Sequence, residues 1–140
     1  NAVSVGGGWN HRLDLSSGIL IKDNHLQVAG SVKAAVELSR EQNRNNLPIE
    51  LEVDTLDQLR EGLDMDVDGF LLDNMSPKLV QDAVTIIRSH PDGETIFVEA
   101  SGGINYDTLE SYAWTGIDAV SMSAITTQAS AVDIKLEFIE

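Results

Sequence analysis

IELEVDTLDQLREGLDMDVDGFLLD, residues 49–73, predicts a strand, a helix and a second strand in succession. The mainly apolar run 49–53 is a strand candidate. Thr55 can cap a helix over residues 56–63, in which the leucines share one face. The apolar run 69–72 is then the next strand. A right-handed connection of this kind makes the two strands parallel.

The same alternation continues on both sides of this stretch. Further strands are predicted at 19–21, 95–98 and 119–121, and further helices at 32–42, 77–88 and 105–114. Strands that recur with helices between them are typical of consecutive βα units. Both a (β/α) barrel and an open doubly wound sheet fit this α/β pattern. The tail over residues 132–138 is apolar at about every second position, and its state stays open.

Composition excludes several classes of protein. The chain has 140 residues, a one-domain length, and a formal charge of −14, which argues against a nucleic-acid partner. It has no cysteine, so disulfides and cysteine-based metal sites are excluded. No apolar run approaches the roughly 20 residues that a membrane span needs, and the N-terminus has no signal pattern. We expect a cytoplasmic protein with no membrane partner.

Each predicted strand runs directly into polar residues at its carboxyl end. These residues are KDNH at 22–25, the carboxylates at 50, 52 and 54, DN at 73–74, EASGG at 99–103 and SMS at 121–123. Parallel α/β folds build their ligand sites at this edge of the sheet. The sequence therefore predicts a site there.

Cations gather near the N-terminus of this acidic chain, in GGGWNHR at 6–12 and KDNH at 22–25. They suggest that an anion is held there. Lys22 follows three apolar residues, so its aliphatic stem is expected to be partly buried. The ordinary alternative is a lysine that extends its ammonium group into water. Its many polar neighbours favour a functional role, since buried lysine is rare unless paired.

Carboxylates on the second and third strands are the natural counterparts of these cations. Glu50, Glu52 and Asp54 share one strand face by their spacing of two. They can pair with lysine or arginine, hold a divalent cation, or bind sugar hydroxyls. We interpret Asp73 as functional, and Asn74 as structural because an Asn turn before a helix cap is common.

A phosphate site is predicted at Ser101, Gly102 and Gly103, because bare backbone N–H groups there precede a helix expected to start near residue 105. The loop after the next strand, residues 121–124, is a natural second half of such a site. The glycines at 6–8 lack the spacing of a dinucleotide-binding motif.

Five motifs, in order, resemble those of quinolinate phosphoribosyltransferases, also called carboxylating nicotinate-nucleotide pyrophosphorylases. They are GGGWNHR (6–12), IKDNH (21–25), ELEVD (50–54), LLDNM (71–75) and EASGGI (99–104). The resemblance extends along essentially the whole chain. It implies a parallel (β/α) barrel and a magnesium-dependent enzyme of NAD biosynthesis. That enzyme joins quinolinate to phosphoribosyl pyrophosphate and yields nicotinate mononucleotide, pyrophosphate and CO2.

The resemblance also implies residue roles. His11, Arg12 and Lys22 correspond to cations that hold the quinolinate carboxylates. Glu52 and Asp73 correspond to carboxylates that act on the ribose and, through the pyrophosphate, on Mg2+. Catalysis is thus assigned to Lys22, Glu52 and Asp73. The 5′-phosphate is assigned to Ser101, Gly102 and Gly103 together with Ser123 and Ala124, although the family commonly has glycine where Ser123 stands.

Chains of this family are about twice as long and begin with a separate α/β domain and the first barrel strands. Residues 1–140 therefore resemble the C-terminal part of the barrel domain. We expect the chain to associate with the missing N-terminal half or to form a homo-oligomer, and to be inactive alone. The alternative is a non-catalytic module of the same fold that binds a phosphate ligand or serves in assembly.

Overall fold

The computed structural model describes residues 2–11, 14 and 16–138, and Arg12 lies outside these residues. One parallel sheet has the strand order β1-β2-β3-β4-β5. Its strands are β1 (Ile19–Ile21), β2 (Ile49–Val53), β3 (Gly69–Asp73), β4 (Phe97–Ser101) and β5 (Ala119–Val120). The helices are α1 (Ala2–Val5), α2 (Asp23–Ala29), α3 (Val32–Gln42), α4 (Leu56–Leu63), α5 (Pro77–Arg88), α6 (Leu109–Ala113) and α7 (Ala124–Thr127).

The sequential strand order decides between the two architectures that the sequence allowed. A doubly wound sheet reverses its strand order at a switch point. The five strands here follow one another without a reversal, as consecutive βα units of a barrel do. The predicted α/β fold of consecutive βα units is confirmed.

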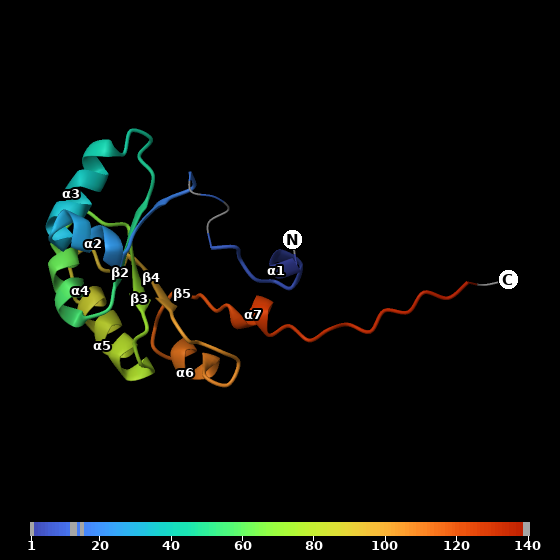
Figure 1. Ribbon diagram of the computed structural model, residues 1–140. Helices are drawn as coiled ribbons and strands as arrows, with labels where there is room; N and C mark the ends of the chain where they lie inside the picture. The colour runs from blue at the N-terminus through green and yellow to red at the C-terminus, as the bar shows by residue number, and fades with distance from the viewer. Residues whose placement is uncertain (1, 12–13, 15, 139–140) are drawn as a thin grey trace.

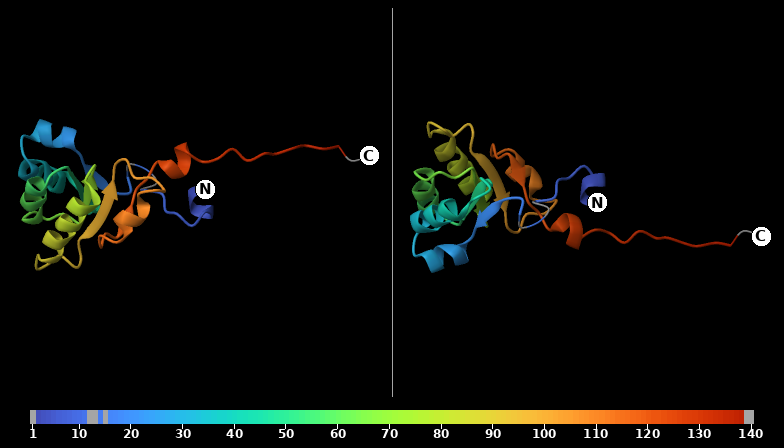
Figure 2. Two further views of the ribbon diagram at one scale, coloured as in Figure 1. Left: turned by 90° about the horizontal axis from the view of Figure 1, so that it is seen from below. Right: turned by 90° about the horizontal axis from the view of Figure 1, so that it is seen from above.

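Helices α2, α3, α4 and α5 cover one face of the sheet, and the N-terminal segment with α1 lies on the opposite side (Figures 1 and 2). The main core lies between the sheet and these helices. Alternate residues of β2 point into it, since Ile49, Leu51 and Val53 are at most 1% exposed. We call the other face of the sheet the inner face.

Local signals explain why two helices begin where the sequence predicts. Thr55 accepts a hydrogen bond from the backbone N–H of Gln58, whose side chain caps Thr55 in return. Ser76 accepts one from the backbone N–H of Leu79, and Pro77 occupies the first turn of α5.

Two predicted elements were wrong at a boundary by two residues or more. Strand β4 covers 97–101 rather than 95–98, so Glu99 lies inside the strand and not beyond its end. Helix α6 begins at Leu109, not near Asn105. The reason is an Asn turn, in which the Asn105 side chain accepts hydrogen bonds from the backbone N–H groups of Asp107 and Thr108.

After α7 the chain leaves the body of the molecule in an extended form (Figure 1). Its apolar side chains are exposed, from 80% at Val132 to 94% at Phe138. None of the helices in the described part of the chain is both long and apolar enough to cross a membrane.

Candidate active site

Lys22 and Glu52 form an ion pair at the carboxyl edge of the sheet. Lys22 directly follows β1, and its Nζ lies 2.6 Å from Oε2 of Glu52 on the inner face of β2. The hydrogen bond to Glu52 raises the pKa of the Lys22 ammonium, and the charges of Glu52, Asp73 and Asp23 add to this, while burial opposes it. Lys22 is therefore held as a cation, and its side chain is 47% exposed, so it is less buried than the sequence predicted.

Asp73, the last residue of β3, lies opposite Ser101 in the register with β4. The Asn74 side-chain amide donates a hydrogen bond of 2.5 Å to Oδ2 of Asp73. Asn74 has a positive φ of 53°, and its backbone N–H donates to the carbonyl of Ser101. Asn74 thus orients the Asp73 carboxylate and ties two strand ends together, as its structural interpretation implies. Lys22, Glu52 and Asp73 come together from three successive strand ends.

The turn after β4 requires its glycines. Gly102 and Gly103 have φ values of 93° and 64°, a region that side chains other than glycine rarely adopt. A Cβ on Gly102 would lie 2.4 Å from Oδ1 of Asn74, whereas one on Gly103 would meet no atom within 4 Å. Gly102 therefore brings the backbone of this turn close to the end of β3, whereas Gly103 is needed for its backbone conformation alone.

A hollow of about 690 Å³ joins this glycine turn to the loop after β5. Ser101, Gly102 and Gly103 line it on one side, and residues 121–123 line it on the other. The arrangement brings together the two loops that the sequence predicts as halves of a phosphate site. Ala124 is 2% exposed at the start of α7 and can contribute only through its backbone. Helix α6 starts six residues after Gly103, so this turn does not stand directly before a helix N-terminus, and that prediction was wrong.

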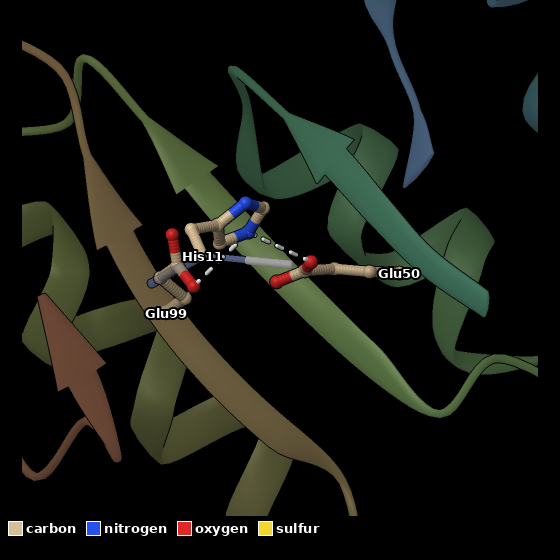
Figure 3. A group of neighbouring side chains, drawn as sticks. All are labelled: His11, Glu50 and Glu99. Carbon is tan, nitrogen blue, oxygen red and sulfur yellow. Dashed lines mark ion pairs between the residues drawn. The ribbon is translucent and has the colours of Figure 1, made fainter. Parts of the chain in front are cut away.

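The side chain of His11 lies over the inner face of the sheet, between two glutamates (Figure 3). Its Nε2 is 3.4 Å from Oε2 of Glu50 and 3.4 Å from Oε2 of Glu99. The sequence placed Glu99 only among the polar residues that follow the fourth predicted strand and gave it no role of its own. The signal that could have identified it is its spacing of two from Ser101, which puts both on the inner face.

Comparison with known proteins adds independent information. The family described as "Quinolinate phosphoribosyl transferase, C-terminal domain" matches residues 1–137. A probable carboxylating nicotinate-nucleotide pyrophosphorylase of Methanothermobacter thermautotrophicus is 38% identical over 136 residues, which are 97% of this chain and 49% of that protein. The human carboxylating nicotinate-nucleotide pyrophosphorylase is 35% identical over 95% of this chain and 44% of its own length.

Solved structures give the same result for the fold. NadC from Streptococcus pyogenes superposes with a TM-score of 0.83 at 36% identity, over 94% of this chain and 45% of that one. The nicotinate-nucleotide pyrophosphorylase from Francisella tularensis matches with the same TM-score of 0.83 and the same 36% identity. The chain spans about half the length of the curated relatives that it matches.

Proposed function

Because the chain belongs to the quinolinate phosphoribosyl transferase C-terminal domain family, we propose that it carries part of the active site of a carboxylating nicotinate-nucleotide pyrophosphorylase. The reaction transfers the phosphoribosyl group of phosphoribosyl pyrophosphate to quinolinate, with loss of CO2. The observation that carries the proposal is the convergence of Lys22, Glu52 and Asp73 beside the glycine turn at 101–103. Residues 1–140 would then be the C-terminal part of the barrel domain.

Lys22 is the described cation best placed to hold a quinolinate carboxylate. Its raised pKa keeps the ammonium charged, and Glu52 fixes its direction. A dianionic substrate needs more than one polar partner, and the His11 imidazole lies over the same inner face, where a ring N–H can donate a hydrogen bond to a carboxylate. Arg12 keeps its predicted role as a two-pronged carboxylate ligand.

Glu52 and Asp73 supply negative charge where a cationic transition state needs it. Departure of pyrophosphate from the ribose gives its anomeric carbon oxocarbenium character, which nearby carboxylates stabilise by electrostatic preorganisation. Glu52 is 7% exposed, so its charge acts in a medium of low polarity.

These two carboxylates also fit Mg2+ bound through the pyrophosphate. One oxygen of Glu52 is engaged by Lys22 and one of Asp73 by Asn74, which leaves an oxygen on each for a water-mediated contact. Mg2+ prefers such oxygen ligands and keeps several of its waters. When bound, it would neutralise the leaving pyrophosphate.

The 5′-phosphate of the ribose is proposed to bind in the hollow between the two loops. Because two of the three residues in the 101–103 turn are glycines, no side chain shields their backbone N–H groups from a ligand. Ser123 adds a hydroxyl from the opposite loop. Asp73 lies opposite Ser101 in the strand register, and Ser101 lines this hollow. One substrate can therefore contact both Asp73 and the hollow.

The test is complementation. The chain is mixed with the N-terminal part of a full-length relative, and quinolinate-dependent release of pyrophosphate is measured. We expect activity only in the mixture. A mixture that assembles but releases no pyrophosphate would favour the non-catalytic module instead.

Lys22→Ala sharpens the assignment of the substrates. In the active mixture we expect the KM for quinolinate to rise about tenfold or more, as for loss of a hydrogen bond to a charged group, with a smaller change in the KM for phosphoribosyl pyrophosphate. Lys33→Ala, on the exposed surface of α3, is the matched control and should change neither constant. Equal losses for both substrates would refute the role given to Lys22.

A further inference from the structure

A second cluster of ionisable side chains lies deeper on the inner face than the candidate active site. Glu50 and Glu99 each precede a residue of that site by two positions, Glu52 in β2 and Ser101 in β4. Two residues along a strand span roughly 6.6 Å, so this cluster is about one layer below. We propose that His11, Glu50 and Glu99 form a binding site for one divalent transition-metal ion of the Zn2+ type.

Distances within the cluster suit a metal ion better than direct hydrogen bonds. Nε2 of His11 is 3.4 Å from an oxygen of each glutamate, longer than the roughly 2.7–2.9 Å of a charge-assisted hydrogen bond. A tetrahedral ion with bonds of about 2.0–2.1 Å holds its ligand atoms roughly 3.3–3.4 Å apart. One ligand atom from each residue lies within 4.8 Å of the others, so all three are near enough to surround one ion.

Glu99 provides an independent reason to expect a cation. It is 4% exposed, and its Oε1 has no hydrogen-bond partner among the described residues. Within the same part of the chain, no lysine or arginine forms an ion pair with it, and its carboxylate is directed at His11 (Figure 3). A buried carboxylate without such partners is costly. A divalent ion would satisfy the free oxygen of Glu99 and neutralise its charge.

The donor set selects the class of metal. Imidazole is a good ligand for Zn2+, Fe2+ and Co2+, whereas Mg2+ and Ca2+ prefer oxygen ligands alone. Three protein ligands leave a fourth position open for water. A cavity of about 810 Å³, lined by all three side chains, gives that position access. The site shares His11 with the proposed quinolinate contacts but is distinct from the pyrophosphate-bound Mg2+ proposed at Glu52 and Asp73, and Zn2+ binding to it can be measured without either substrate.

The experiment is a calorimetric titration of the 140-residue chain, freed of metal by a chelator, with Zn2+. We expect one Zn2+ per chain and a rise in the thermal midpoint on binding. Co2+ in place of Zn2+ should give the intense visible absorption of a four-coordinate site.

Variants identify the ligands. Glu99→Gln and His11→Gln should each weaken Zn2+ binding by about a hundredfold or more, since loss of an outer partner alone costs about 10–100-fold. The control is His90→Gln, which removes a histidine paired with Asp92 at 3.9 Å outside the cluster and should bind Zn2+ as the parent chain does. Far-ultraviolet circular dichroism reports whether each variant is folded. Absence of Zn2+ binding by the folded parent chain, or equal binding by folded Glu99→Gln, would overturn the proposal.

Discussion

Single residues decide how closely the ends of β3 and β4 approach each other. Asn74 adopts a positive φ, donates its backbone N–H to Ser101 and directs its side chain at Asp73. Gly102 makes this possible, because any side chain there would occupy the space of Asn74. The distance between a predicted catalytic carboxylate and a predicted phosphate loop thus depends on the pair Asn74 and Gly102.

Substitution of the two glycines separates crowding from backbone strain. Both positions have positive φ, which costs an ordinary residue about 1–2 kcal/mol. Gly103→Ala should lower the free energy of unfolding by about that amount. Gly102→Ala should cost more, because its Cβ would also lie 2.4 Å from Asn74. Urea denaturation measures both, and equal losses would show that the contact with Asn74 is not important.

The polar residues of the candidate active site were largely predictable, and those of the deeper cluster were not. Lys22 and Asp73 stand at strand ends, where the position in the chain already indicates the edge of the sheet. Glu99 lies inside a strand, and its partner His11 is distant in sequence. Such a contact depends on the path of the N-terminal segment over the inner face, which no local pattern specifies.

At the scale of elements, two aspartates join strands to helices at the amino edge of the sheet. Asp118 accepts hydrogen bonds from the backbone N–H of Val98 at 2.8 Å and from Arg88 of α5 at 2.9 Å. Asp68 accepts hydrogen bonds from the backbone N–H of Ile49 at 2.7 Å and from the Arg40 side chain of α3 at 3.0 Å. An aspartate that accepts from a strand backbone and from a helix arginine therefore occurs twice, and these contacts anchor the amino ends of β2 and β4.

The variant Asp118→Ala tests whether the aspartate contacts at the amino edge stabilise the fold. It leaves the backbone N–H of Val98, a fully buried residue, without its partner, which costs about 1–3 kcal/mol of unfolding free energy. Asp107→Ala is an exposed control expected to change stability by no more than about 0.5 kcal/mol. Thermal unfolding compares the two, and similar midpoints would contradict the anchoring role.

Most elements were predictable from local signals, and the errors have a physical cause. Ser76 and Pro77 specify the start of α5 directly, as Thr55 and Gln58 specify that of α4. The start of α6 was wrong because Asn105 bonds its own following backbone in a turn instead of capping a helix. Helix α2 was missed because its seven residues carry little apolar periodicity.

At the scale of the whole molecule, the sheet is covered by helices on one face only (Figures 1 and 2). Its inner face carries Phe97 at 43% exposure, and Trp9 beside it is 95% exposed. Strands β1 and β5 have neighbours on one side only within the described sheet. Open edges and apolar surface of this kind favour association.

We therefore expect the isolated chain to associate in solution, with itself or with the complementary half of a relative. Sedimentation velocity at several concentrations should show species larger than the 15.2 kDa monomer. Mixing with the complementary half should replace them by one defined complex. A compact monomer that does not bind the complementary half would contradict this expectation.

Consecutive residues are enough to predict the alternation of strands and helices, the polar residues at the strand ends and the family. Helix caps, apolar periodicity and motif order involve residues that are close together in the sequence, so they can be recognised without the structure. The folded chain was needed to reveal the strand order, the pairing of Lys22 with Glu52 and the contacts of His11 with Glu50 and Glu99. These depend on contacts between distant segments, which form when the helices pack on one face of the sheet and the N-terminal segment crosses the other.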